Sequence, residues 1–479
     1  MEPIYEPHAS PVQLERLNRL FEAQQASYDA NRYPDAEVRR TNLGKLEKVL
    51  LDNIDAIAQA ISADFGSRSP NETRIELFAS IEGIRHAKSH LKGWMKSRRA
   101  GVSMWFAPAT GKVMPQPLGV VGIIVPWNYP AYLAIGPLTS ALAAGNRAMI
   151  KMSEATPHTG ELLGNLLRSQ FDESLVCVIN GGPDVAQAFS SKPFDHLLFT
   201  GSTAVGKHVM RAAADHLTPV TLELGGKSPT ILSPDFPMET AVKRIMFGKC
   251  FNAGQTCVAP DYLLVPAGKE QAFIDLARQQ VAKFFPKMAT NNDFSAVVNP
   301  RHRQRLQGYL DDARAKGATL IELNPAGENL SATGKIAPTL VLNVNDDMKI
   351  MQEEIFGPLL PILPYRDLGE AIKYVNARPR PLALYYFDHD SRRIDRVMRE
   401  TISGGVTLND TIIHFPQDDL PTGGVGASGM GYYHGKYGFD TMSKLKGIIS
   451  QSRFDTLWLM HPPYGRMFKT IYKLMTGRN

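Results

Sequence analysis

The chain has 479 residues, of which 43% are hydrophobic and 21% are charged, an ordinary globular composition with enough length for two or three cores. The net charge of +6, from 53 Lys and Arg against 47 Asp and Glu, is spread along the chain and argues against a nucleic-acid partner. The three cysteines, Cys177, Cys250 and Cys257, fit neither a disulfide framework nor a CxxC metal motif, so we expect reduced thiols and no metal site.

The N-terminus and the longest apolar run predict no targeting or membrane segment. Residues 1–10 lack the charged and then apolar pattern of a secretory signal, so we expect a cytoplasmic protein. Residues 131–150 are mostly apolar, but Gly136, Pro137 and Arg147 interrupt them, and they do not make a membrane span of ~20 residues.

The predicted elements change in character along the chain. In residues 11–65 the apolar positions recur at helical spacing, within a helical segment predicted for residues 1–105. Residues 106–116 are polar and hairpin-like. From 117 to 224, short apolar runs alternate with amphipathic segments, which indicates β-α-β units and a parallel sheet. The predicted strands there are residues 120–125, 148–152, 175–179, 196–199 and 220–224.

A second α/β domain is predicted for residues 225–425, where helical segments again alternate with apolar runs. Its predicted strands include residues 262–265, 339–342 and 359–363. The glycine-dense stretch 421–431 does not suit a regular element and predicts a loop packed closely against neighbouring backbone. The final segment, 426–479, ends in a tail whose apolar residues recur on one helical face beside basic side chains.

Cys257 follows small and polar residues, the setting of a side chain that a substrate must reach. A thiol near its usual pKa of ~8.5 is only a few per cent thiolate at neutral pH, yet it is intrinsically very nucleophilic. On this pattern alone, an isolated cysteine is more often a small buried hydrophobic residue. That interpretation is kept for Cys177 and Cys250.

Glu223 ends an apolar predicted strand and precedes Gly225 and Gly226, which let a ligand approach the backbone closely. A glutamate in a partly apolar site has a raised pKa, which suits a general base. The competing interpretation is a structural glutamate paired with Lys227, and the local pattern does not decide between the two.

Two further stretches follow predicted strands, where an open parallel sheet binds its ligands. Gly201 and Gly206 flank the entry to a helix whose first N–H groups favour a phosphate, although the spacing lacks the full dinucleotide fingerprint and a plain strand-to-helix turn competes. Lys151 and Glu154 offer a cation and a carboxylate to ribose hydroxyls, or form a solvated pair.

Asn128 stands between two prolines after a predicted strand, as a rigid amide donor suited to an oxyanion or as a helix cap. In residues 353–358, acidic groups such as Glu354 lie beside Phe356, which is typical of a ribose-binding loop or of a plain turn. Neither stretch decides the function by itself.

Taken together and in order, the stretches around Asn128, Lys151, Gly201, Glu223, Cys257 and Glu354 closely resemble the motifs of the aldehyde dehydrogenase superfamily, over about residues 40–450. The resemblance implies an α/β fold with a Rossmann-type NAD-binding domain at 117–224 and a catalytic domain at 225–425. It also implies a small oligomerisation element made of the hairpin 106–116 and a return strand within 426–479. The family's twisted five-stranded cofactor sheet departs from the dinucleotide fingerprint.

The resemblance also assigns residue roles. Cys257 becomes the nucleophile and Glu223 the general base that activates water, while Asn128 and the Cys257 N–H form the oxyanion hole. The implied cofactor is NAD, with NADP as a possibility. The residues implied to bind it are Ile124, Pro126, Trp127, Lys151, Ser153, Glu154, Gly201, Ser202, Val205, Gly206, Leu224, Gly225, Glu354 and Phe356.

The implied reaction oxidises an aldehyde to a carboxylic acid through a thioester on Cys257. Donors placed where charge develops would stabilise the alkoxide that thiolate attack creates. Glu223 argues for hydrolysis of the thioester, because superfamily members that pass the acyl group to coenzyme A generally lack this glutamate. A coenzyme A-acylating enzyme and a non-catalytic binding protein are the remote alternatives.

The short N-terminal region, residues 64–70 and residues 461–464 resemble the class 3 and fatty aldehyde dehydrogenase branch, especially its bacterial coniferyl aldehyde dehydrogenases. The resemblance favours a coniferyl or other bulky apolar aldehyde as substrate, with medium- or long-chain fatty aldehydes as the alternative, and it implies a homodimer. The basic tail helix could touch a membrane surface, but packing across a substrate entrance or a second subunit is favoured.

Overall fold

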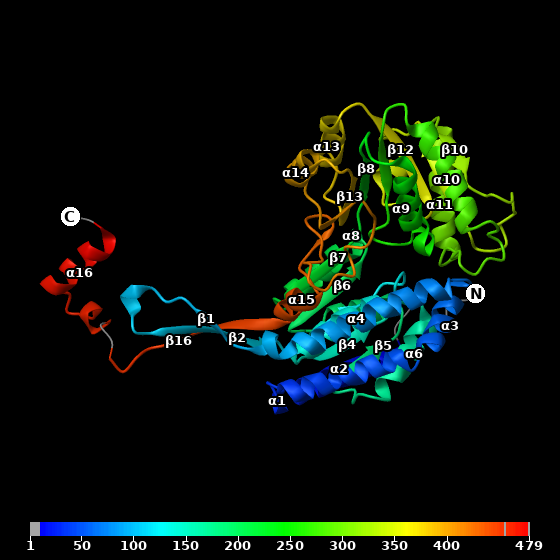
Figure 1. The fold of residues 1–479 in the computed structure, drawn as a ribbon. Helices are drawn as coiled ribbons and strands as arrows, with labels where there is room; N and C mark the ends of the chain where they lie inside the picture. Colours follow the sequence, from blue (N-terminus) through cyan, green and yellow to red (C-terminus); the bar gives the residue numbers. More distant parts are fainter. Residues whose placement is uncertain (1–9, 455–456, 478–479) are drawn as a thin grey trace.

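The computed structural model describes residues 10–454 and 457–477, arranged as two lobes and a projecting arm (Figure 1). Residues 1–9, at the start of the predicted helical segment, and the last two residues of the tail lie outside the described part. The helices predicted for residues 11–65 are confirmed, and a long fourth helix follows them. Ser10 begins the first helix with a capping box, because its hydroxyl accepts from the Gln13 N–H and its own N–H donates to the Gln13 side chain. These helices are α1 (Pro11–Ala30), α2 (Ala36–Leu51), α3 (Ile54–Phe65) and α4 (Pro70–Met95).

The first lobe is built on a sheet with the strand order β15-β7-β6-β3-β4-β5. All pairs are parallel except β15 with β7, so the predicted parallel sheet is confirmed and gains an antiparallel edge strand. Helices α2 to α6 cover one face, and α1, α7 and α8 cover the other. The bounds are β3 (Val120–Ile124), β4 (Arg147–Lys151), β5 (Val176–Ile179), β6 (His196–Gly201), β7 (Val220–Leu224), β15 (Gly429–Met430), α5 (Tyr132–Ala144), α6 (Pro157–Arg168), α7 (Pro183–Ser190) and α8 (Thr203–Ala214).

The second lobe holds a sheet with the order β10-β11-β12-β9-β8-β13-β14, parallel except at β10. Helices α9 and α10 pack on one face, and α11 to α14 pack on the other. The three strands predicted for this lobe are confirmed as β9, β11 and β12. The bounds are β8 (Pro229–Leu232), β9 (Tyr262–Pro266), β10 (Thr319–Glu322), β11 (Thr339–Leu342), β12 (Leu359–Tyr365), β13 (Ala383–Phe387), β14 (Gly405–Leu408), α9 (Met238–Cys250), α10 (Glu270–Phe284), α11 (Pro300–Ala315), α12 (Lys349–Gln352), α13 (Leu368–Asn376) and α14 (Ser391–Glu400).

The glycine-dense stretch 421–431 crosses from the second lobe back to the first and is mostly irregular, as predicted. A Cβ on Gly424 would lie 1.9 Å from the carbonyl oxygen of Ser428, so the chain can fold on itself here only with glycine. The stretch ends in β15, where Gly429 pairs with Glu223 of β7. The helix α15 (Gly435–Thr441) then leads into the arm.

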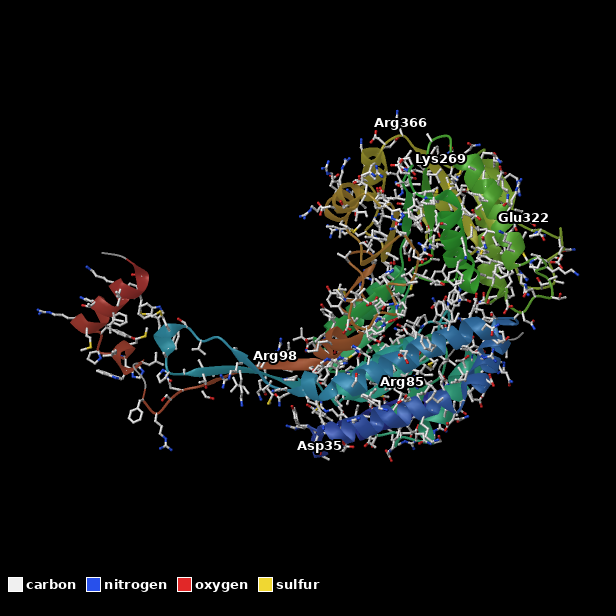
Figure 2. All side chains as sticks on the ribbon, in the orientation of Figure 1. Asp35, Arg85, Arg98, Lys269, Glu322 and Arg366 are labelled. Atoms are coloured by element: carbon white, nitrogen blue, oxygen red, sulfur yellow. The ribbon has the colours of Figure 1, made fainter. Side chains whose placement is uncertain are left out.

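The arm consists of β1 (Arg98–Ala100), β2 (Thr110–Pro117) and β16 (Ser443–Ser450), which extend away from both lobes (Figure 1). A hairpin confined to residues 106–116 is therefore wrong. Those residues hold only the turn and most of β2, whose partners are β1 before it and β16 more than 300 residues later along the chain. Side chains such as Arg98 project from the arm (Figure 2), and this basic sequence gave no apolar pattern from which to predict β1.

Beyond the arm lie η3 (Leu457–Met460) and the tail helix α16 (Arg466–Thr476), which confirms the predicted helical tail. Its apolar side chains include Met467, Tyr472 and Leu474, each more than half exposed. No helix in the described residues is long and apolar enough to cross a membrane.

Candidate active site

Two cavities meet at Cys257. A cleft of about 310 Å³ is lined by residues of both lobes and contains the polar side chains of Asn128, Glu223 and Glu354. A second pocket of about 220 Å³ is mainly apolar and aromatic. The residues that give it this character are Tyr129, Tyr132, Phe247, Phe251, Val258, Ile412, Ile413 and Phe415. Cys257 lines both cavities, so its sulfur can be reached from a polar side and from an apolar side.

A sharp turn after α9 presents Cys257 to the cavities. The short 3₁₀ segment η2 (Phe251–Gly254) holds Asn252 at φ 51° and Ala253 at φ 50°, both in the left-handed region that side chains rarely adopt. A Cβ on Gly254 would lie 2.3 Å from the carbonyl oxygen of Gly357. Such strained backbone persists only where its surroundings hold it, and it often marks a functional site.

The Cys257 thiol is partly exposed and its pKa is raised well above the usual value by burial, with further contributions from the carboxylates of Glu354 and Glu223. Burial therefore favours the neutral thiol of Cys257 over the thiolate. Cys177 and Cys250 are fully buried, and burial raises the pKa of each to about 12. The prediction that these two are buried structural residues is confirmed.

Glu223 is the penultimate residue of β7, is 3% exposed and lines the cleft. Within the described residues, neither carboxylate oxygen has a hydrogen-bond partner, and burial raises the pKa of this group well above its usual value. The competing pair with Lys227 is excluded, because that ammonium group contacts Asp261 and the carbonyl of Ile350 instead. An unpartnered carboxylate of this kind can accept a proton from a water molecule that enters the cleft.

Asn128 follows β3 and is 3% exposed. Its backbone carbonyl oxygen accepts hydrogen bonds from Arg68 at 2.5 Å and from the Asn252 side chain at 3.0 Å, while its side-chain amide nitrogen donates to the Gln255 carbonyl at 3.2 Å. The amide carries two hydrogens, so one donor remains for a ligand in the cleft. The cap of α5 is Ala131, which excludes the helix-cap interpretation of Asn128.

Most of the predicted site residues line the cleft: Pro126, Trp127, Asn128, Gly201, Ser202, Glu223, Leu224, Gly225, Cys257, Glu354 and Phe356. The others lie outside its lining, on β3, β4, α8 and the loop after β4: Ile124, Lys151, Ser153, Glu154, Val205 and Gly206. Strands β6, β3 and β4 are neighbours in the sheet, so the chain segments after them lie side by side along one edge.

Lys151 and Glu154 do not form the solvated pair that the sequence left open. The Lys151 nitrogen is buried and donates to the Met152 carbonyl at 2.7 Å, and burial lowers its pKa to about 8. Glu154 is exposed in the loop that follows. Beside them, Ser202 caps α8 and accepts from the Val205 N–H at 3.4 Å, so the remaining first-turn N–H groups of this helix face outward.

Glu354 and Phe356 form the opposite wall of the cleft. A Cβ on Gly225 would lie 2.0 Å from a carboxylate oxygen of Glu354, so this glycine makes the space that the carboxylate occupies. Phe356, at φ 50°, has its ring at 5.3 Å from that of Trp127. Carboxylates can bind ribose hydroxyls, and a helix N-terminus can bind a diphosphate. The groups in this cleft therefore fit a dinucleotide.

The chain matches the model of the aldehyde dehydrogenase family over residues 8–448. It belongs to the aldehyde dehydrogenase family. The predicted fold is confirmed by its similarity to a solved structure of Staphylococcus aureus AldH in the substrate-bound state. The two structures have a TM-score of 0.90 and 38% sequence identity, over 96% of this chain and 99% of that one. The enzyme is thus an oxidoreductase that acts on aldehydes.

Relatives of this aldehyde dehydrogenase agree with the predicted branch. A probable coniferyl aldehyde dehydrogenase of Pseudomonas aeruginosa is 55% identical over 97% of both chains. The rat aldehyde dehydrogenase family 3 member A2 is 41% identical over 92% of this chain and 89% of its own length. A Staphylococcus aureus betaine aldehyde dehydrogenase solved with NAD⁺ has a TM-score of 0.83 and 28% identity, covering 92% and 88% of the two chains. A nicotinamide cofactor is therefore supported.

Several residues that line the cleft of this aldehyde dehydrogenase were not predicted. His302, Arg305 and Tyr309 come from α11, and their helical pattern gave no chemical motif. Arg305 donates to the carbonyls of Glu354 and Ile355, at 3.2 and 2.9 Å, and so fixes the loop of Glu354. The aromatic residues of the second pocket were also missed, because they come from three separate segments.

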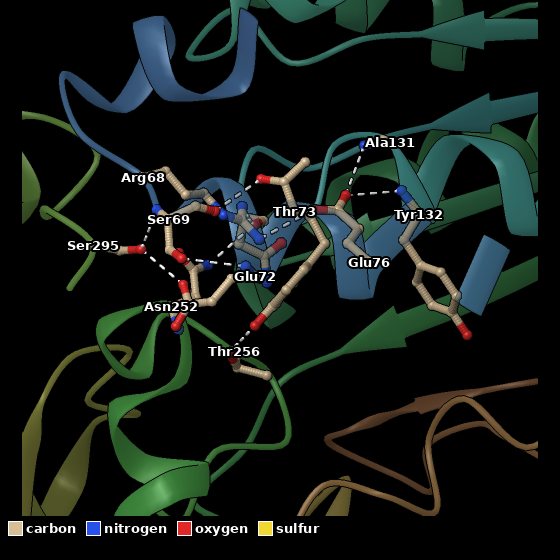
Figure 3. A network of polar contacts seen from close by, with 12 residues as sticks. Arg68, Ser69, Glu72, Thr73, Glu76, Ala131, Tyr132, Asn252, Thr256 and Ser295 are labelled. Atoms are coloured by element: carbon tan, nitrogen blue, oxygen red, sulfur yellow. Dashed lines mark hydrogen bonds and ion pairs between the residues drawn. The ribbon is translucent and has the colours of Figure 1, made fainter. Parts of the chain in front are cut away.

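A buried polar network in the first turns of α4 supports the active-site loops (Figure 3). Arg68, which is 1% exposed, pairs with Glu76 at 3.0 Å, and Glu76 accepts from the N–H groups of Ala131 and Tyr132. Burial raises the pKa of Glu76, against the effect of Arg68. These contacts join α4 to the Asn128 loop. Arg68 also donates a hydrogen bond to the backbone carbonyl of Asn128 in this loop.

Glu72 extends the network to the cysteine loop. Its carboxylate accepts from the Asn252 N–H at 3.0 Å and from the Ser295 hydroxyl at 2.8 Å, and burial raises its pKa to about 7. The N–H of Asn252 lies in the left-handed turn before Cys257, so this bond holds the strained backbone in place.

The Arg68→Met substitution is expected to lower the free energy of unfolding by about 3–5 kcal/mol, because Glu76 would remain buried without its charged partner. Urea denaturation measures this loss. Arg74→Met is the control, since Arg74 pairs with Asp55 at an exposed site and should change stability little. Equal stability of the Arg68→Met and wild-type proteins would contradict the structural role of this pair.

Proposed function

We propose that this enzyme oxidises a coniferyl-type or other aromatic aldehyde to its carboxylic acid, with NAD as cofactor and with a thioester on Cys257 as intermediate. The observation that supports this most is the position of Cys257, between a polar cleft that fits a dinucleotide and an aromatic pocket that fits a flat apolar substrate. A hydrolytic outcome is supported by the buried, unpartnered carboxylate of Glu223 in the same cleft.

Groups of the protein itself act in each chemical step of the proposed reaction. The Cys257 thiol first gives its proton to water in the cleft, and the thiolate then attacks the aldehyde carbon. The alkoxide that forms is stabilised by the free side-chain amide hydrogen of Asn128 and by the Cys257 N–H. When bound, the oxidised dinucleotide supplies the acceptor for the hydride. Glu223 then takes a proton from a water molecule as that water attacks the thioester, and the acid leaves from the pocket.

The aromatic pocket favours an aromatic substrate over an alkyl one. Tyr129 and Phe251 are nearly parallel, with ring centroids 6.2 Å apart, and Phe247 lies next to Phe251 at 5.6 Å. Such rings add specific contacts to the burial of a flat substrate. The name of the 55% identical relative supports the same choice. Medium- or long-chain fatty aldehydes are the second candidate, since Ile75, Ile412 and Ile413 also line this pocket.

A comparison of kcat/KM for a cinnamyl-type aldehyde, a benzaldehyde-type aldehyde and an alkyl aldehyde tests this proposal. We expect the cinnamyl-type substrate to exceed the alkyl one by about tenfold or more, which is ~1.4 kcal/mol and within the usual range for aromatic contacts. A higher value for the alkyl aldehyde would favour the second candidate. Acid formed without coenzyme A excludes an acylating enzyme, and no reduction of the cofactor with any aldehyde would support a non-catalytic protein.

NAD is the proposed cofactor because the exposed carboxylate of Glu154 would repel the 2′-phosphate of NADP. The Glu154→Gln substitution is expected to raise the kcat/KM ratio of NADP to NAD by about two- to fivefold, since exposed charges interact by ~1 kcal/mol or less. Glu161→Gln, on the neighbouring helix α6, serves as the control. An unchanged ratio would remove Glu154 from cofactor selection.

We further propose a cytoplasmic homodimer that pairs through the arm, with no nucleic-acid partner. Support comes from β1 and β16, whose side chains are largely exposed, and from α16, which lies outside both lobes (Figure 1) and has exposed apolar side chains. Exposed apolar surface of this kind is typical of a contact site. Packing of α16 on a second subunit is favoured over contact with a membrane surface, and sedimentation with and without lipid vesicles distinguishes the two.

A further inference from the structure

The buried carboxylate of Glu223 needs a route for the proton that it removes from water. It is 3% exposed and has no hydrogen-bond partner in the described part of the chain, so no protein group in direct contact with it takes the proton onward. Each turnover must nevertheless return Glu223 to its ionised form. A polar path through the protein that begins near Glu223 would meet this need.

The return segment after β15 brings such a path to Glu223. Gly429 pairs with Glu223, and a Cβ on Gly431 would lie 2.8 Å from the Thr221 hydroxyl, so this segment runs tightly along β7. Tyr433 follows two residues later. Its ring is fully buried and its hydroxyl has no partner among the described residues, while Ser140 fixes its backbone by donating to its carbonyl at 2.7 Å.

A small cavity lies beyond Tyr433. It has a volume of about 20 Å³, which is room for about one water molecule, and its lining includes Tyr132, Tyr433, His434, Ser140 and Asp418. The Tyr132 hydroxyl and His434 Nε2 are hydrogen-bonded at 3.1 Å, so this wall of the cavity is an ordered polar surface. Asp418 also lines the cavity and is partly exposed to solvent.

We propose that the Tyr433 hydroxyl, one water molecule in this cavity and the Asp418 carboxylate form a relay that carries the proton from Glu223 to solvent. The inference rests on the proposed role of Glu223 as general base. Tyr433 is a positioning and relay residue in this scheme, and a water molecule bridges it to Glu223.

The proton balance of the relay is simple. Water loses one proton to Glu223 as its oxygen bonds to the acyl carbon and the bond from that carbon to sulfur breaks. Tyr433 then accepts one proton and releases its own to the cavity water in the same step. The water passes a proton to Asp418, which releases it to solvent. A concerted exchange suits this site, because burial raises the pKa of Tyr433 well above its usual value, with Tyr132, Glu223 and Cys257 adding to this rise, and disfavours the free tyrosinate.

Asp418 suits the exit of this relay. Burial raises the pKa of its carboxyl group, while the nearby His86 acts in the opposite direction. A carboxylate with a raised pKa binds a proton more readily at neutral pH than an ordinary aspartate does. Its partial exposure then allows release to solvent.

The test uses Tyr433→Phe and Asp418→Asn in the full-length enzyme with NAD and a cinnamyl-type aldehyde. The first turnover is followed by the absorbance of reduced nicotinamide, and decay of the acylated enzyme is followed by intact-protein mass. We expect an unchanged first turnover, a decay slowed by about tenfold, and a larger solvent deuterium effect on that decay; this loss is smaller than the roughly 10²-fold or more of a missing general base.

Two matched controls are adjacent in the sequence. Tyr432→Phe and Asp419→Asn change exposed side chains next to the relay and should leave both rates unchanged. Because the Tyr433 hydroxyl has no partner in the described structure, its removal should cost little stability. Should Tyr433→Phe fail to fold, Asp418→Asn at the solvent end still tests the relay.

The relay is overturned if Tyr433→Phe and Asp418→Asn decay at the wild-type rate, or if the first turnover slows by the same factor as the decay. Glu223→Gln separates this failure from that of the proposed function. A stalled Glu223→Gln enzyme beside a normal Tyr433→Phe enzyme removes only the relay. A Glu223→Gln enzyme that deacylates normally removes the general base and the relay together.

Discussion

Replacing Cys257 with serine is expected to lower kcat by roughly 10³-fold or more, the scale of loss found when a nucleophile is removed. The serine hydroxyl has nearly the size of the thiol but is a much weaker nucleophile at neutral pH, and here it would lie between the same carboxylates of Glu223 and Glu354 that already disfavour the anion. The rate of nicotinamide reduction with a saturating aldehyde measures the loss.

The Cys257→Ser protein should fold normally, because serine is nearly the size of cysteine and the side chain lines two cavities. Cys250→Ala is the matched control, since that thiol is fully buried and seven positions earlier in the chain. It should retain activity while losing some stability to the cavity that the change creates. A Cys257→Ser enzyme with more than a small fraction of wild-type turnover would contradict the role of this thiol.

The Glu223→Gln substitution is expected to separate the two halves of the reaction. One equivalent of reduced cofactor per subunit should form rapidly, and steady-state turnover should then fall by about 10²- to 10⁴-fold, the usual contribution of a general base. Glutamine preserves the shape of the side chain but cannot accept the proton of water. Rapid mixing with absorbance detection resolves the two phases, and Glu173→Gln, at a surface ion pair with Arg16, is the control.

The pH dependence of this step follows from the raised pKa of Glu223. Only the ionised form of Glu223 can take the proton of water, so deacylation should speed up as pH rises through this raised folded-state pKa. The same shift acts on stability with the opposite sign: the folded state binds this proton more tightly than the unfolded state, so the stabilisation is lost as pH rises. Glu223→Gln should abolish the activity rise, and a persistent rise would assign it to another group.

The sequence predicted the parallel sheet and its ligand-binding edge because each strand is a short apolar run and each site residue follows one. Asn128, Gly201 and Glu223 could be located in this way, since the chain passes directly from a buried strand into the cleft. Cys257 could not be assigned by pattern alone. Its reactivity depends on its position between two cavities, and that position comes from folding the second lobe against the first.

The remaining parts of the site depend on contacts between distant segments. Arg68 lies in the stretch 64–70 that resembles the family branch, and Glu76 lies in the predicted helical segment, but neither pattern predicts that packing against the Asn128 loop makes them a buried pair. Tyr433 lies in a glycine-rich region whose course depends on β15 pairing with β7. The arm was mispredicted for the same reason, since β2 pairs with β16 from the far end of the chain.

The central claim is a thioester on Cys257, and trapping it tests that claim most directly. Glu223→Gln enzyme is mixed with NAD and a cinnamyl-type aldehyde, quenched in acid, digested and analysed by mass spectrometry. The proposed mechanism predicts one acyl group per chain, on the peptide that contains Cys257, with the mass of the aldehyde less one hydrogen replacing the thiol hydrogen. Absence of this adduct, or its presence on Cys177 or Cys250 instead, would contradict the mechanism.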